Sequence, residues 1–176
     1  AIFFFFLLIL EVILFNNTLF KYLFMLIQTL QTLFKRDLTS LKREINAYHN
    51  EAVIWSSDQQ INNSAGNLCL HLIGNLNTYI GAEIGKTNYV RNRTLEFSAK
   101  NISKSELIQK IDETITVVHQ ALNQLSKEDL ESEYPLLVLD KKTSYGFFLV
   151  HLASNLAYHF GQLTYHRSLL IALEMN

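Results

Sequence analysis

Residues 144–173 read SYGFFLVHLASNLAYHFGQLTYHRSLLIAL, a stretch without proline in which apolar residues recur every three or four positions. The recurring positions are Leu149, Leu152, Leu156, Phe160 and Leu163. That spacing places them on one face of an α-helix. We therefore predict a long helix after the break at Pro135, with Thr143 as its N-terminal cap.

Further segments have the same periodicity, namely residues 25–48, 65–82 and 103–125. Ser64 is placed to cap the second of them, and Ser103 with Glu106 predicts a capping box at the start of the third. Residues 51–63 and 86–101 are more polar and lack the helical period, so they are predicted to be connections. Amphipathic helices joined by short and medium connections favour antiparallel neighbours. The sequence therefore predicts an all-α protein, an up-down four-helix bundle.

The composition fits one such domain in a reducing compartment. The chain has 176 residues, of which 49% are hydrophobic and 18% charged, and its formal net charge is -1. This balance gives no electrostatic reason to expect nucleic acid as a partner. The single cysteine, Cys69, excludes an internal disulfide and is predicted to be a core thiol. We expect a cytoplasmic protein.

Residues 1–24 form a strongly apolar segment that begins AIFFFFLLILEVILF. Its uninterrupted apolar runs are shorter than the roughly 20 residues that cross a bilayer, and no basic residue precedes them as in a signal peptide. The amphipathic pattern is complete from Met25 onward. We therefore predict residues 1–24 to be an upstream extension or a mistranslated leader outside a domain of residues 25–176. The alternatives are a hydrophobic hairpin or an anchor that associates the protein with a membrane.

Polar side chains gather beside the apolar stripe of the last helix rather than opposite it. At roughly 100° per residue, one sector of about 80° contains the following set: His151, Asn155, His159, Gln162 and His166. On the second helix Asn67, His71 and Asn75 recur every fourth residue, in a segment without charge until Glu83. A histidine in such a setting is expected to face the interior and to need partners.

Two interpretations of these polar residues stay open. The first is a hydrogen-bonded layer that fixes the register of the helices, with His71 and His159 paired to neighbouring amides or to Tyr158. The second is a metal site, since facing helices of a bundle commonly present ligands to an ion. His49 and His119 have polar neighbours and are expected to be exposed. His166 is expected to pair locally with Tyr165 or Arg167.

The segments HLASNLAYHFGQLTYHRSLL and NSAGNLCLHLIGNL resemble the DinB-like (YfiT-like) superfamily of metal-dependent bundle proteins. The similarity extends from Met25 to about Leu170 and includes the segment NYVRNRTLEFS. It implies a zinc or nickel ion held by one histidine of the second helix and two of the last. Carried over, the ligands are His71, position 155 and His159. Position 155 is Asn, where that family usually has His, and a carboxamide oxygen is a weak ligand for zinc or nickel. A weak site or none is therefore expected.

The resemblance also implies an enzyme of transferase or hydrolase type, with a small-molecule substrate or a thiol cofactor. Arg91 and Arg93 are candidates for binding an anionic group, and the alternative is that they pair with Glu96 or solvent. The other candidate pocket residues are Asn67, Asn75, His151 and Gln162. We expect a homodimer. The competing function is a metal-free helical module that binds a small molecule or dimerises without catalysis.

Overall fold

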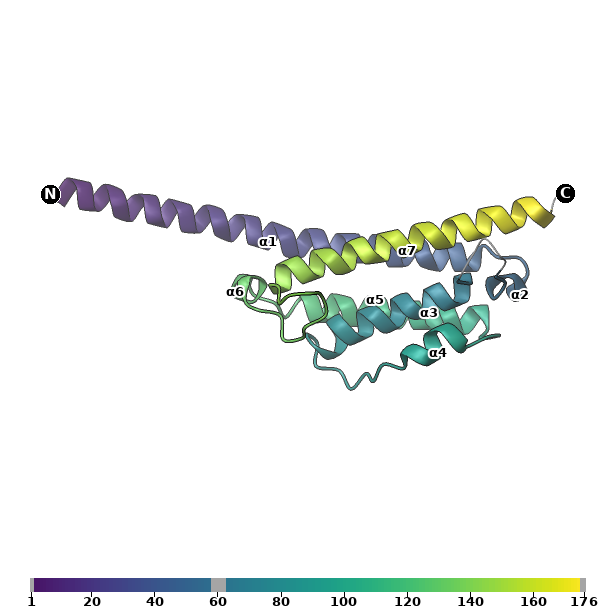
Figure 1. Ribbon diagram of the computed structural model, residues 1–176. Coiled ribbons are helices and arrows are strands. Elements are labelled where there is room, and N and C mark those ends of the chain that lie inside the picture. Colours follow the sequence, from purple (N-terminus) through teal and green to yellow (C-terminus); the bar gives the residue numbers. More distant parts are fainter. Residues whose placement is uncertain (1, 58–62, 175–176) are drawn as a thin grey trace.

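The computed structural model describes residues 2–57 and 63–174 of the chain. These ranges contain helices and no named strand (Figure 1). The longer helices are α1 (Ile2–Asn46), α3 (Ala65–Leu76), α5 (Lys104–Leu122) and α7 (Tyr145–Glu174). The shorter ones are α2 (Glu51–Ile54), α4 (Arg93–Ser98) and α6 (Lys127–Glu131), and a π-helical segment, η1 (Asn77–Ala82), continues α3. The predicted all-α class is confirmed.

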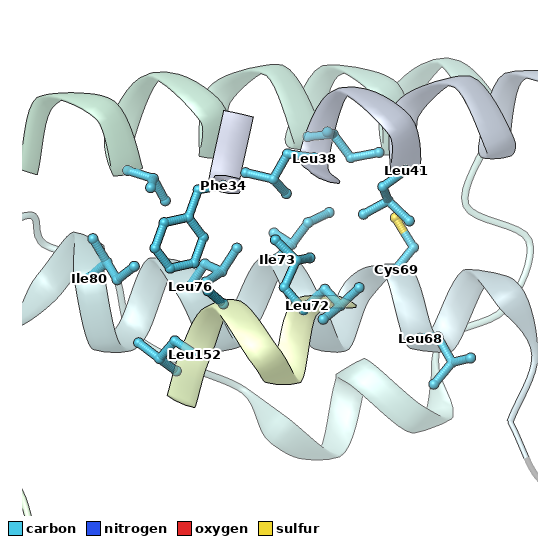
Figure 2. Packing of buried hydrophobic residues seen from close by; sticks show 14 of the residues in the cluster. Phe34, Leu38, Leu41, Leu68, Cys69, Leu72, Ile73, Leu76, Ile80 and Leu152 are labelled. Atoms are coloured by element: carbon cyan, nitrogen blue, oxygen red, sulfur yellow. The ribbon is translucent and has the colours of Figure 1, made fainter. Parts of the chain in front are cut away.

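The core lies between four helices, because α1 packs against α5 and α7, and α3 packs against the same two. Figure 1 shows α1 and α7 along one side of the molecule, with α3 and α5 along the other. Figure 2 shows the Phe34 ring of α1 beside Leu76 of α3, with Leu152 of α7 on the far side of Leu76. The apolar stripes predicted from the sequence are thus the faces that the helices bury. Cys69 is fully buried among them, as predicted.

Serine caps fix the start of α3, α5, α6 and α7, with two corrections to the prediction. Ser64 and Ser103 each accept a backbone N–H at 3.2 Å, from Asn67 and Glu106. Within the described residues Glu106 does not return the bond, and the complete capping box is instead at Ser126, which opens α6. Thr143 does not cap α7.

The cap of α7 is Ser144, whose Oγ accepts the backbone N–H of Phe147 at 3.3 Å. The reason is a short antiparallel pairing just before the helix. The Thr143 carbonyl accepts the N–H of Tyr134 at 2.8 Å, and the Tyr145 N–H donates to Ser132 at 3.0 Å. This pairing holds Thr143 outside the helix.

Both segments predicted to be connections contain a short helix. The first contains α2, followed by Trp55, whose indole N–H donates to the Ile102 carbonyl at 3.2 Å. The second contains α4, which packs against α3. Each short helix buries one side chain, Ile54 in α2 and Glu96 in α4. Both helices are too short to show a repeating apolar pattern in the sequence.

The N-terminal segment is helical and continuous with the rest of α1. The backbone of α1 runs without a break from Ile2 to Asn46, so the hairpin alternative is wrong. The side chains of residues 1–21, 23 and 24 lie outside the described part of the chain, and the domain boundary at Met25 stays a prediction. Among the described residues no helix combines the length and the apolar character needed to span a membrane.

Candidate functional site

The facing surfaces of α3 and α7 bring the predicted ligands together. The imidazole rings of His71 and His159 have centroids 5.1 Å apart and lie nearly perpendicular. One turn along each helix, the side-chain N–H of Asn75 donates to the Asn155 carboxamide oxygen at 3.4 Å. A step of four residues up α3 therefore matches a step of four down α7, which is the register of an antiparallel pair.

Glu96 on α4 holds the ring of His71 from the side away from α7. Its Oε2 lies 3.0 Å from His71 Nδ1, and the residue is only 5% exposed. A carboxylate only accepts, so His71 Nδ1 carries the hydrogen and donates. Gly74 makes room for this approach, because a Cβ at that position would overlap Glu96 Oε1.

Arg91 binds the same carboxylate with two hydrogen bonds. Its Nε donates to Glu96 Oε1 at 2.6 Å and its Nη2 to Oε2 at 2.9 Å. The guanidinium also lies 5.7 Å from the centroid of the Tyr79 ring. The alternative that Arg91 pairs with Glu96 is confirmed, while Arg93 is exposed. Binding of an anion by either arginine stays a prediction.

The charges of this cluster follow from burial and hydrogen bonding. Burial on its own would raise the pKa of Glu96, but the hydrogen bonds from Arg91 and His71 hold that pKa below its usual value. The pKa of His71 lies below its usual value, with burial as the largest cause and the charges of His159 and Arg91 acting in the same direction, although the hydrogen bond and charge of Glu96 oppose them. At neutral pH Glu96 is therefore ionised and His71 is neutral. With its hydrogen on Nδ1, the His71 ring has a free electron pair on Nε2.

His159 has the same arrangement of its two nitrogens. Its Nδ1 lies 2.7 Å from Gln162 Oε1, an acceptor, so this nitrogen donates. The Gln162 amide in turn donates to the Tyr158 hydroxyl at 3.2 Å. Within the described chain no hydrogen bond is made by Nε2 of either His71 or His159. Each imidazole therefore has one nitrogen anchored by a neighbour and the other available.

Asn75 contributes a buried oxygen beside this pair. Its Oδ1 is the one buried side-chain nitrogen or oxygen without a hydrogen-bond partner in the described part of the chain. Such an atom costs about 1–3 kcal/mol of desolvation and calls for an explanation. Asn75 lies one helix turn after His71 and next to Asn155. An acceptor without a hydrogen-bond partner is therefore present close to the two histidines.

Other polar residues singled out from the sequence have structural partners. Asn67 donates to the carbonyls of Glu96 and Ala99, at 2.9 and 3.0 Å, and so ties α4 to the start of α3. His151 is half-buried and stacks on Phe148 with ring centroids 5.9 Å apart. Gln162 is exposed, and its side chain forms hydrogen bonds with His159 and Tyr158. His49 and His119 are exposed, as predicted.

The local pairing predicted for His166 is wrong. This residue is 1% exposed, and its Nδ1 lies 2.8 Å from the Tyr48 hydroxyl, just beyond α1. Its Nε2 lies 2.9 Å from the Ser56 carbonyl, which only accepts, so the hydrogen is on Nε2 and Tyr48 donates to Nδ1. Because α7 packs with α1 at this end, the ring turns inward rather than toward its sequence neighbours.

The described residues contain no group of three or more His, Cys, Asp or Glu side chains that could hold a metal ion. The donors at the candidate site are two imidazoles, and carboxamides supply the remaining oxygens. The sequence indicated Glu96 only as a partner for Arg91 or Arg93. Its contact with His71 was not predicted. The sequence feature that pointed to Glu96 is that it is the single carboxylate beside two arginines in NYVRNRTLEFS.

A comparison with protein-family models matches residues 20–174 to DUF1572, described as a protein of unknown function. The match covers most of the chain, and the protein belongs to this family. Neither the curated proteins nor the solved structures that were compared give a match.

Proposed function

We propose that this protein is a DinB-like (YfiT-like) up-down four-helix bundle that binds one divalent metal ion, weakly, between α3 and α7. The ligands in this proposal are Nε2 of His71, Nε2 of His159 and the carboxamide oxygen of Asn155. Asn75 Oδ1 is the alternative oxygen, because it lacks a hydrogen-bond partner.

The observation that carries the proposal is the state of the two imidazoles. Each has Nδ1 anchored by an acceptor, at 3.0 Å for His71 and 2.7 Å for His159. Ligating histidines are oriented in this way, with the second nitrogen donating to a carboxylate or another oxygen. The ring centroids, 5.1 Å apart, leave the rings close enough to share an ion bound at about 2.0–2.1 Å from each nitrogen.

The same donor set argues for low affinity. Zinc and nickel prefer imidazole, whereas a carboxamide oxygen is a weak ligand for either. The Arg91 charge near His71 also opposes a cation, although Glu96 compensates it at 2.6 Å. An enzyme activity of transferase or hydrolase type would extend this proposal through the resemblance, and no described residue fixes its substrate.

The test is a titration of the untagged protein with zinc and with nickel, measured by calorimetry and by the melting temperature. Binding to one site that is lost in His159→Ala supports the proposal. His119→Ala is the matched control, because that imidazole is exposed and far from the site in sequence. Equal binding by the natural chain and His159→Ala would refute the proposal.

The competing function is a metal-free module, and one observation favours it. His71 already donates a hydrogen bond to Glu96, whose charge Arg91 neutralises. Such a cluster can serve to hold α4 on α3 without any ion. If the natural chain binds neither metal and is folded and stable without it, this function replaces the first.

A further inference from the structure

The outward side of α7 carries no charge over most of its length. From Tyr145 to His166 the helix contains no Lys, Arg, Asp or Glu. Figure 1 shows α7 along one edge of the molecule. We call its exposed positions the α7 outer face, which consists of Phe147, Val150, Ser154, Ala157, Tyr158, Gly161, Gln162, Tyr165 and Ser168.

Large apolar side chains on this face are open to solvent. Phe147 is 58% exposed, Tyr158 63% and Tyr165 66%. Between them stand small residues, and a Cβ added at Gly161 would meet no atom within 4 Å. The solvated side of a helix usually carries charged residues, while aromatic and small residues at steps of three and four are typical of helix–helix contact.

We propose that the α7 outer face binds the same face of a second copy of this chain, with the two helices antiparallel. The two-fold axis passes between positions 157 and 158. This register sets large side chains of one copy against small or medium ones of the other: Tyr158 against Ala157, Tyr165 against Val150, and Phe147 against Ser168. Gly161 then lies against Ser154 on either side of the axis, where both side chains are small. In a parallel pair Tyr158 and Tyr165 would each meet themselves.

Charge and area both fit a second copy as the occupant. Because the face is uncharged and the net charge of the chain is -1, two copies meet without like-charge repulsion along the contact. An aromatic side chain buries about 150–250 Å² in full, so three that are more than half exposed provide roughly 300–450 Å² per copy. That is about half of the ~600–1,000 Å² that each partner buries in a standard interface, and the other positions of the face add to it.

The test uses the full chain and a charge at the axis. Sedimentation should show a dimer for the natural protein. Ala157→Glu and Ala157→Lys should each raise the dimer dissociation constant about a hundredfold, because two like charges then lie together at the axis. An equimolar mixture of the two variants should restore the dimer, since opposite charges then meet there. Gln120→Glu, at an exposed position of α5, is the control and should change nothing.

Ala157 is exposed, so both variants should fold like the natural protein, and their circular dichroism spectra check this. A natural chain that is monomeric at micromolar concentration overturns the proposal. So does a dimer that Ala157→Glu leaves intact, or two dissociated variants whose mixture stays monomeric. The result is independent of metal binding, because no ligand of the candidate site is changed.

Discussion

The Tyr48 hydroxyl donates to His166 Nδ1 at 2.8 Å, and this bond joins two residues that are 118 positions apart in the chain. Both are buried, Tyr48 just beyond α1 and His166 near the C-terminal end of α7. The Ser56 carbonyl holds the other nitrogen of the ring at 2.9 Å, so the segment after α2 is fixed at the same place. The His166 side chain thus links three parts of the chain: α7, the residues after α1 and the residues after α2.

Tyr48→Phe should lower the free energy of unfolding by about 1–2 kcal/mol, because it removes one buried hydrogen bond without leaving a cavity. Denaturant unfolding followed by circular dichroism measures this. Tyr165→Phe, at an exposed tyrosine of the same helix as His166, is the matched control and should have a much smaller effect. Equal effects of the two substitutions would show that the Tyr48 bond contributes nothing to stability.

The ion pair between Arg91 and Glu96 should be strongly coupled. A double-mutant cycle with Arg91→Ala and Glu96→Ala should give a coupling energy of about 1–3 kcal/mol, since the two groups are largely buried and share two hydrogen bonds. The pair Lys42 and Asp112 is the control, because its 2.6 Å contact is as short but its side chains are 38% and 49% exposed. Solvent screening should make that coupling clearly smaller. Similar values for the two cycles would mean that α4 does not bury Glu96 in solution.

Gly74→Ala should destabilise the protein by about 1–3 kcal/mol, because the added methyl group would overlap a carboxylate that Arg91 and His71 hold in place. Gly161→Ala is the opposite case. No atom of the same chain lies within 4 Å of its added Cβ, and alanine favours a helix over glycine, so a gain of about 0.4–1 kcal/mol is expected for the monomer, at a protein concentration below the dimer dissociation constant. Thermal unfolding of both variants at one protein concentration measures the difference. A neutral Gly74→Ala would show that Glu96 can leave its position at no cost.

The thiol of Cys69 should be inert in the folded protein. The side chain is fully buried, and burial raises its pKa to about 12, so almost no thiolate forms up to pH 9. A thiol-specific reagent should react with the natural chain only after denaturant is added. Thr116→Cys, on the exposed side of α5, should add one thiol that reacts at once. Rapid reaction of the natural chain would contradict the core position of Cys69.

Features that depend on neighbouring residues could be predicted from the sequence. The buried stripes of the helices, the Ser64 and Ser103 caps and the core position of Cys69 follow from periodicity and from the hydrogen bonds of one helix turn. Partners that lie far away in the chain could not be predicted in this way. Glu96 reaches His71 only because a short helix packs on α3, and nothing in its local sequence marks it as buried. The partner of His166 could not be predicted for the same reason, since Tyr48 lies 118 positions earlier in the chain. The approach of His71 to His159 was expected because both lie on long helices whose register the apolar stripes define.

The metal proposal makes its sharpest prediction at position 155. Asn155→His should bind zinc or nickel much more tightly than the natural chain, because it replaces a weak oxygen ligand with a third imidazole one helix turn from His159. Asn155 already lies beside the site, since it accepts the Asn75 amide at 3.4 Å. At a metal concentration about 100 times the dissociation constant, the linked gain in stability is about 2.7 kcal/mol, which a melting experiment resolves easily. The natural protein should show a smaller shift at the same concentration.

Ser154→His is the matched control for that variant. It adds a histidine at the neighbouring position of α7, but on the exposed side of the helix, off the face that carries His159; the imidazole nearest to it along the helix is His151, which is outside the proposed ligand set. Its response to metal should equal that of the natural chain. The combination Asn155→His with His71→Ala should lose the gain, because one of the three ligands is then missing. If Asn155→His and Ser154→His respond alike, or if removal of His71 makes no difference, the ion is not held between α3 and α7. The pair of histidines would then be part of the polar layer that fixes the two helices in register.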